Sequence, residues 1–204
     1  MDDSSLGSLR RFVSQREPGE RCDLCRAPVA PDHSHLLEVG TRKLVCGCRA
    51  CSLLFTGHAS ARYRLLPTRV LYLRGFELTD EQWDELQVPV NLAFFTREGG
   101  TGRVVAAYPS PAGPTESQLA LDTWQQVEAA NPVVRELEPD VEALLVNRIG
   151  AARDHFIVPI DECYRLVGLV RVGWRGLSGG SEVWEAMARF LVELKSRSRV
   201  VGVA

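Results

Sequence analysis

Residues 21–55, RCDLCRAPVAPDHSHLLEVGTRKLVCGCRACSLLF, decide the fold of the first part of this chain. They hold five of the six cysteines in 204 residues. Four form matched C-x2-C pairs, Cys22 with Cys25 and Cys48 with Cys51, on either side of a predicted hairpin. Four thiolates at about 2.3 Å from one ion make a tetrahedral shell. Because this spacing is typical of zinc sites, the sequence predicts a small metal-binding module.

The ligand set has alternatives, because Cys46 lies two residues before Cys48 and offers a C-x-C pair. The first C-x2-C pair could combine with this C-x-C, or all five sulfur atoms could share or exchange an ion. We favour the matched pairs and expect Cys46 to be a strand residue beside the site. His33 and His35 are further candidate ligands, which we expect on one strand face, solvated or hydrogen-bonded to acids.

The metal is predicted to be zinc, with iron as the alternative. Rubredoxin-type iron sites also use two C-x2-C pairs, but their turns usually carry glycine soon after the second cysteine. Here Arg26 and Ser52 occupy those positions. Four thiolates around a divalent ion leave a local charge of about −2. Nearby cations can offset it: Arg21, Arg26, Arg42, Lys43 and Arg49.

The chain divides by composition into three parts. Residues 1–20 form a polar arm, residues 21–56 the cysteine module and residues 57–204 a larger domain. An apolar content of 45% in 204 residues supports one ordinary domain with a small appended module. The predicted fold class is therefore α+β: a small four-cysteine module, zinc-ribbon or rubredoxin-like, followed by a mixed α+β domain.

Within the larger domain, strand and helix patterns alternate. The clearest helix has apolar residues at Val183, Met187, Phe190, Leu191 and Leu194. Residues 161–174 have helical spacing but are rich in valine, so a strand remains open. Other expected elements are strands in 62–78, a short helix capped by Thr79, a hairpin turning at 97–103 and followed by a Pro-rich loop, a helix in 115–132, and strands at 142–148 and 154–160.

Composition excludes several function classes. The net charge is −2, and no apolar run approaches the length of a membrane span. The first residues, MDDSSLGSLRRF, contain no apolar signal segment, so we expect a cytoplasmic protein. There, paired cysteines indicate metal or redox chemistry rather than disulfides. His155 and Cys163 lack the motif context of a catalytic base and nucleophile, so no enzyme is predicted.

One further stretch, RGLSGGSEVW (175–184), is a candidate contact surface. Gly179 and Gly180 precede a predicted helix, where N–H groups can face an anion. The simpler interpretation is that Ser181 caps this helix. Trp174 and Arg175 are the residues we expect to be exposed if the stretch binds a partner.

The segments CDLC, HSHLLE, CGCRACSLLF and CYRLVGLVRVGWRGLSGGSEVW resemble an uncharacterised bacterial family. Genes of that family often lie beside those of high-affinity, oxygen-tolerant nickel-iron hydrogenases. The resemblance spans roughly residues 20–195 and supplies no catalytic residues. It implies an accessory role in hydrogenase maturation, assembly or electron transfer.

The function predicted from these observations is that of a non-enzymatic, metal-binding accessory protein. Its expected partner is a protein, either a hydrogenase subunit or a maturation factor, and its oligomeric state stays open. A rubredoxin-like iron electron carrier is the first alternative. A nucleic-acid-binding zinc ribbon is the second. It is favoured by the basic character of residues 1–75 and opposed by the lack of aromatic residues around the cysteine turns, where only Phe55 and Tyr63 could stack on bases.

Overall fold

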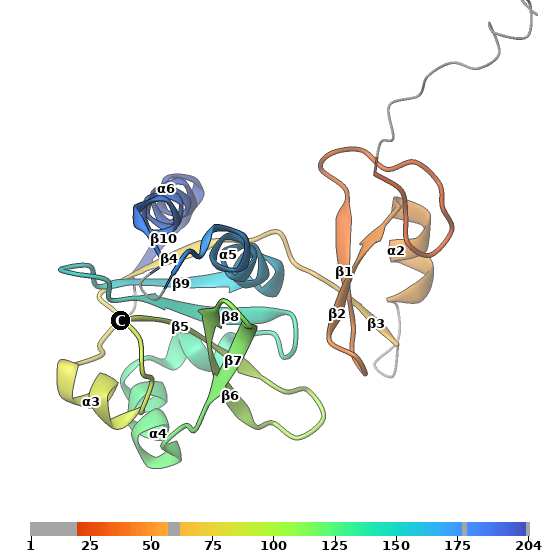
Figure 1. Ribbon diagram of the computed structural model, residues 1–204. Helices are drawn as coiled ribbons and strands as arrows, with labels where there is room; N and C mark the ends of the chain where they lie inside the picture. The colour runs from red at the N-terminus through yellow and green to blue at the C-terminus, as the bar shows by residue number, and fades with distance from the viewer. Residues whose placement is uncertain (1–19, 57–61, 177–178, 203–204) are drawn as a thin grey trace, which may run out of the picture. The chain divides into compact units, whose positions relative to one another are not determined.

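The computed structural model describes residues 20–56, 62–176 and 179–202. All but the last residue of the predicted polar arm, 1–20, lies outside the described residues. The chain forms two compact units, Met1–Tyr63 and Arg64–Ala204. The first carries the cysteine cluster and the second a large sheet with helices (Figure 1).

The first unit is built on a hairpin. Strand β1 (Ser34–Glu38) pairs antiparallel with β2 (Lys43–Gly47). The third strand of this sheet, β3 (Tyr63–Leu65), spans the boundary between the two units. Helix α2 (Arg49–Phe55) follows β2 after a single residue. The predicted fold class is confirmed by this zinc-ribbon-like module and by the mixed α+β unit that follows.

Gly47 allows the hairpin to pack closely against α2. A Cβ atom at Gly47 would lie 2.2 Å from Leu36 Cδ1 and 2.9 Å from Ser52 Oγ. Leu36 and its cross-strand partner Val45 are buried on one face of the hairpin, and Leu37 is buried on the other, so the apolar core is small. Such a core is far too small to stabilise an isolated module of this length.

The second unit contains a seven-stranded sheet of order β10-β4-β9-β8-β5-β6-β7. Neighbouring strands are antiparallel except β10 with β4, which are parallel. The strands are β4 (Leu71–Arg74), β5 (Leu92–Arg97), β6 (Val104–Ser110), β7 (Gly113–Ser117), β8 (Glu142–Asn147), β9 (Asp154–Pro159) and β10 (Arg199–Gly202).

Helices cover both faces of this sheet (Figure 1). Helices α5 (Ile160–Gly173) and α6 (Ser181–Arg197) lie on one face. Helices α3 (Asp80–Glu85) and α4 (Leu121–Ala130), with the 3-10 helix η1 (Pro132–Glu136), belong to the other. Among the described residues no helix has the length and apolar character needed to cross a membrane.

The predicted helices are confirmed at α3, α5 and α6. Thr79 caps α3 through a capping box with Gln82, because Gln82 N–H donates to Thr79 Oγ1 while the Gln82 side chain accepts from Thr79 N–H. The valine-rich stretch 161–174 is helical up to Gly173. Every apolar residue predicted to define α6 is buried: Val183, Met187, Phe190, Leu191 and Leu194.

Two of the secondary-structure elements predicted for this unit were wrong. The Pro-rich loop after β6 is in fact a second hairpin, with β6 joined to β7 across a short turn at 111–112. The helix predicted in 115–132 therefore begins only at Leu121. Pro109 and Pro114 are paired residues in this hairpin. Because proline cannot donate a hydrogen bond to a neighbouring strand, such residues favour a loop over a strand when only the sequence is considered.

His155 lies in the core of this unit, and its titration gives a testable pH dependence. Its ring stacks on Phe76 with centroids 4.5 Å apart, and burial followed by the charge of Arg148 lowers its pKa to about 4. Above the ordinary value of about 6.5 both folded and unfolded states hold neutral histidine. Between about 6.5 and 4 only the unfolded state takes up the proton, so lowering the pH across this interval favours unfolding.

We expect the free energy of unfolding of wild-type protein to fall by about 3 kcal/mol more, between pH 6.5 and 4, than that of His155→Phe. Phenylalanine keeps an aromatic ring beside Phe76 and removes the titrating group. Urea denaturation at a series of pH values measures the difference. Parallel pH dependence of the two proteins would show that His155 does not supply this loss.

Candidate metal centre

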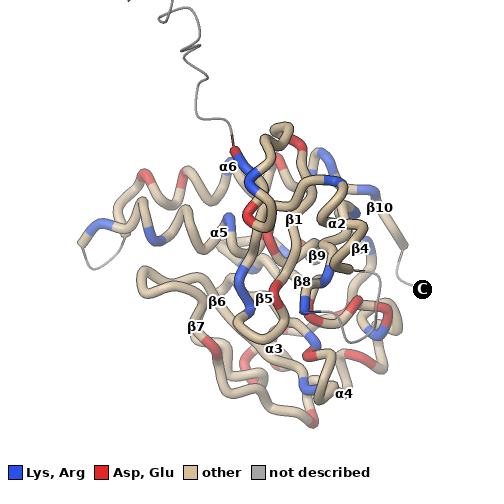
Figure 2. Tube along the Cα trace, turned by 90° about the vertical axis from the view of Figure 1, so that its right-hand side faces the viewer, with Lys and Arg blue, Asp and Glu red and all other residues tan. Residues whose placement is uncertain are grey.

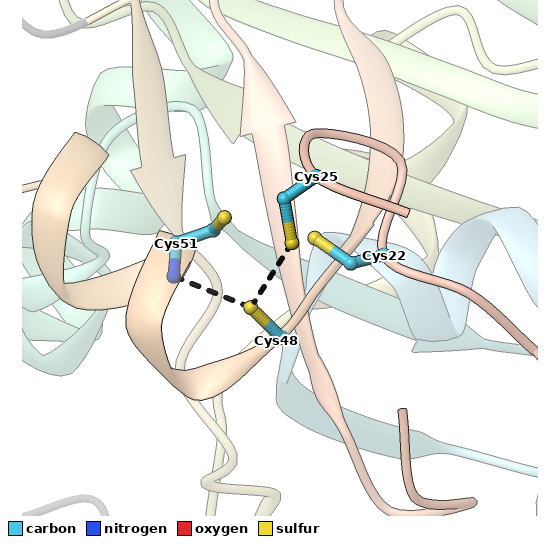
Figure 3. A group of neighbouring side chains, drawn as sticks. All are labelled: Cys22, Cys25, Cys48 and Cys51. Atoms are coloured by element: carbon cyan, nitrogen blue, oxygen red, sulfur yellow. Dashed lines mark hydrogen bonds between the residues drawn. The ribbon is translucent and has the colours of Figure 1, made fainter. Parts of the chain in front are cut away.

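The four paired cysteines come together in the first unit. Sulfur atoms of Cys22, Cys25, Cys48 and Cys51 all lie within 4.8 Å of one another (Figure 3). Cys25 Sγ and Cys48 Sγ are 3.7 Å apart. In a tetrahedral shell with metal–sulfur distances near 2.3 Å, sulfur atoms stand about 3.8 Å apart. The cluster therefore has dimensions that suit one metal ion.

Backbone hydrogen bonds hold the first cysteine turn against the hairpin. Cys22 N–H donates to Ala27 O and Arg26 N–H donates to Cys22 O, both at 2.8 Å. Asp23 adds two bonds to Cys46, because its N–H donates to Cys46 O at 2.8 Å and its carboxylate accepts from Cys46 N–H at 2.7 Å. This positioning role of Asp23 was missed from the sequence, although its place inside the C-x2-C motif is a usable signal.

The second pair lies at the start of a helix. Cys48 is the N-cap of α2, and its sulfur accepts from Cys51 N–H at 3.5 Å. Figure 3 shows this bond and the Cys25–Cys48 contact as dashed lines. Positive partial charge at a helix N-terminus stabilises a thiolate. The two halves of the cluster thus differ: one is a loop turn, and the other is a helix start.

Neighbouring groups shift the acidities of these thiols in opposite directions. Burial raises the pKa of Cys22, but backbone N–H groups of Cys48, Cys25 and Leu24 outweigh it and lower that pKa to about 6. Burial, followed by the adjacent sulfur atoms, raises the pKa of Cys51 to about 12. The Cys22 thiol therefore ionises readily, and its negative charge opposes the ionisation of Cys51. A cation among the sulfur atoms would remove that opposition.

The backbone at Arg26 bears on the comparison with rubredoxin-type turns, which usually carry glycine after the second cysteine. Arg26 adopts a left-handed conformation, with φ of 65°, at the position where rubredoxin-type turns usually carry glycine. Arginine thus adopts here the backbone conformation that glycine favours. The choice between zinc and iron stays a prediction.

The remaining ligand candidates lie outside the four-cysteine set and form a group of their own. Cys46 lies on β2 and is paired with His35 across the hairpin. A ring nitrogen of His33, one of His35 and Cys46 Sγ all lie within 4.8 Å of one another. His33 and His35 lie close together, with ring centroids 4.9 Å apart, but His33 precedes β1 and only His35 is a strand residue. His33 is not solvated, because its side chain is only 5% exposed.

The candidate contact residues gather between α5 and α6. Trp174 caps the C-terminus of α5, and its ring lies 6.3 Å from that of Trp184. The two tryptophans line an apolar cavity of about 370 Å³ together with Leu92 of β5 and Tyr108 of β6. Arg175 N–H donates to Gly179 O at 3.1 Å, which closes the turn before α6.

Gly179 and Gly180 are needed at this turn for conformational reasons. Their φ values of 88° and 77° lie in the left-handed region, which favours glycine. Gly180 occupies the N-cap position of α6, and Ser181 is the first helical residue, so the prediction that Ser181 caps the helix was wrong. The glycines thus have a structural role in directing the chain into α6.

The other residues considered for chemistry are buried. Cys163 lies inside the unit on α5, where burial, followed by the charge of Asp161, raises its thiol pKa well above the ordinary value. His155 lies on β9 against Phe76. Neither side chain is accessible to a substrate.

Comparison with known proteins identifies one family. The model of a family of unknown function, DUF5947, matches residues 21–198, which include the four-cysteine cluster and almost all of the second unit. No curated protein and no solved structure matches the chain. Because the match covers most of its length, the chain belongs to the DUF5947 family.

Proposed function

We propose that this protein is a non-enzymatic accessory protein in which one zinc ion shapes a small module for contact with a protein partner. The observation that carries the proposal is the closed set of four cysteine sulfur atoms. Four thiolates fill every position of a tetrahedral zinc ion, so no position is left for a substrate. A site of this kind stabilises a fold rather than catalysing a reaction.

Zinc is proposed over iron because the second cysteine pair belongs to a helix start within a zinc-ribbon-like hairpin module. An iron electron carrier with the same ligands is the alternative. Visible absorption distinguishes the two ions, since ferric thiolate sites are coloured and zinc has a filled d shell. Elemental analysis of the purified protein, with that spectrum, tests the assignment.

A surface suited to protein contact lies directly after the metal cluster. Helix α2 exposes three consecutive apolar side chains: Leu53 is 72% exposed, Leu54 73% and Phe55 48%. Apolar side chains grouped in this way mark contact sites more often than isolated ones do. The metal would hold this surface in place, because the helix begins at two of the proposed ligands.

The nucleic-acid alternative is supported by one group of aromatic and basic side chains. Phe55 and Tyr63 lie edge to face at 6.4 Å, and the Arg62 guanidinium lies 5.4 Å from the Tyr63 ring centroid. Basic and acidic positions are intermixed along the described chain, however (Figure 2). Binding that weakens steeply with added salt would favour this alternative over a protein partner.

The proposed partner is a nickel-iron hydrogenase or one of its maturation factors, and this part rests on the sequence resemblance alone. We expect deletion of the gene to lower hydrogenase activity in the native host while the hydrogenase transcript stays unchanged. Complementation with wild type should restore activity, and Leu53→Ser/Leu54→Ser should restore it poorly. Val172→Ser is a matched control, because Val172 is also an exposed apolar residue but lies on α5.

Two results would contradict this proposal. Unchanged hydrogenase activity in the deletion strain would remove the hydrogenase from it. A lost transcript would indicate regulation of the gene, which favours the nucleic-acid alternative.

A further inference from the structure

A second group of metal-binding side chains is created by the register of the β1–β2 hairpin. His33 directly precedes β1 and His35 lies on it, and their rings meet edge to face with centroids 4.9 Å apart. Cys46 stands directly opposite His35 on β2. Directly paired residues of antiparallel strands point to the same side of the sheet. Three ligands of borderline-soft type therefore lie close together.

The dimensions of this group approach those of a coordination shell. Its three ligand atoms lie within 4.8 Å of one another, and the two imidazole rings meet edge to face. Around zinc, with metal–nitrogen distances near 2.05 Å, ligand nitrogens stand about 3.4 Å apart. Small rotations of the side chains would close this difference. No change of strand register is required.

His33 supplies an independent sign of a missing partner. Its Nδ1 lies 2.8 Å from Ala30 O, and a carbonyl oxygen can only accept, so Nδ1 carries the proton. Nε2 then presents its lone pair. That atom is buried and has no hydrogen-bond partner among the residues the structure describes, in a side chain that is 5% exposed. A buried acceptor left without a donor is unusual in a folded protein.

This arrangement is the one that metal-binding histidines adopt. They commonly donate the second ring N–H to a carbonyl or carboxylate, which fixes the tautomer and the ring orientation. Ala30 O fulfils that role, and the Glu20 carboxylate lies 3.4 Å from the same Nδ1. The lone pair of Nε2 is thus held ready for a ligand that accepts electrons.

We propose that His33, His35 and Cys46 form a second site, which binds a borderline-soft divalent transition-metal ion of the zinc class. This site shares no ligand with the four-cysteine cluster. Two neutral imidazoles and one thiolate leave a divalent ion with a net charge of about +1, whereas the four-cysteine shell leaves about −2. Three protein ligands also leave a fourth position for water or an external ligand. The second ion is therefore bound more weakly and exchanges more readily than the first.

Cobalt(II) tests the second site, because it takes zinc positions and its spectrum reports the ligands. The full-length protein is stripped of metal, loaded with one equivalent of Zn²⁺ and titrated with Co²⁺. Wild type should bind close to one further equivalent, with a thiolate-to-cobalt charge-transfer band. His35→Ala and Cys46→Ser should weaken this second step by at least about 100-fold and leave the first zinc in place.

Ser34→Ala is the matched control. Ser34 lies between the two histidines and, by strand alternation, points to the opposite face, so the second step should be unchanged. Far-ultraviolet circular dichroism of the zinc-loaded variants checks that the module stays folded. His33→Asn gives a further variant that removes the buried Nε2 acceptor, and it should also lose the second step.

Three outcomes would overturn the second site. Wild type could bind only one ion in total, cobalt could bind without a thiolate band, or His35→Ala and Cys46→Ser could bind the second ion like wild type. In each case the first zinc would still be retained. Loss of the first zinc in wild type would instead contradict the four-cysteine site.

Discussion

Removal of the metal is expected to unfold residues 21–56 while the second unit stays folded. Besides Cys22 and Cys51, the buried apolar residues of the module are few: Leu36, Leu37 and Val45. Domains below about 40 residues usually need disulfides, metals or assembly to fold. Structural zinc supplies about 10–16 kcal/mol in small modules of this kind. The seven-stranded sheet has its own core and does not require the ion.

Limited proteolysis and hydrogen exchange after treatment with a strong chelator measure this effect. Loss of metal is verified first by elemental analysis. We expect protection to disappear from β1, β2 and α2, to persist in β8 and β9, and to return when zinc is added back. Unchanged protease resistance of the module after verified metal removal would contradict a folding role for the ion.

Cys48→Ser and Cys51→Ser are expected to lose the tightly bound ion. Each variant replaces one thiolate in a four-ligand shell by a hydroxyl that stays protonated at neutral pH and is a poor ligand. The affinity should fall by at least about 100-fold. Cys46→Ser should keep one tightly held ion per chain, because Cys46 lies on β2 outside the four-cysteine set.

Metal stoichiometry of the three purified variants after gel filtration tests this prediction. If Cys46→Ser lost the tight ion and Cys51→Ser kept it, the ligand set would be the C-x-C alternative. Equal losses from all three variants would point to a five-sulfur or exchanging site.

The cysteine cluster could be predicted from the sequence because its information is local. Two C-x2-C motifs and a hairpin of suitable length require no knowledge of distant contacts. Helix α6 was predictable for the same reason, since its apolar spacing repeats over 17 residues. The sequence of 161–174 allows two interpretations because valine favours strands; in the structure it is a helix that buries Leu166 and Val170.

Elements that depend on distant partners could not be predicted. Strand β10 exists because Arg199–Gly202 pairs in parallel with Leu71–Arg74, more than a hundred residues earlier. The group of His33, His35 and Cys46 depends on the register of β1 with β2, and a slip of one residue would place Cys46 on the other face. The sequence shows that these candidate ligands are present, but it does not show that they lie close together in the fold.

Metal X-ray absorption of the Cys46→Ser protein is a direct test of the closed four-cysteine zinc site. This variant lacks a ligand of the proposed second site, so the signal comes from the tight ion alone. We expect zinc with four sulfur neighbours at about 2.3 Å and no nitrogen neighbours. An iron edge, or a zinc ion with imidazole nitrogens in its shell, would contradict a closed four-cysteine zinc site.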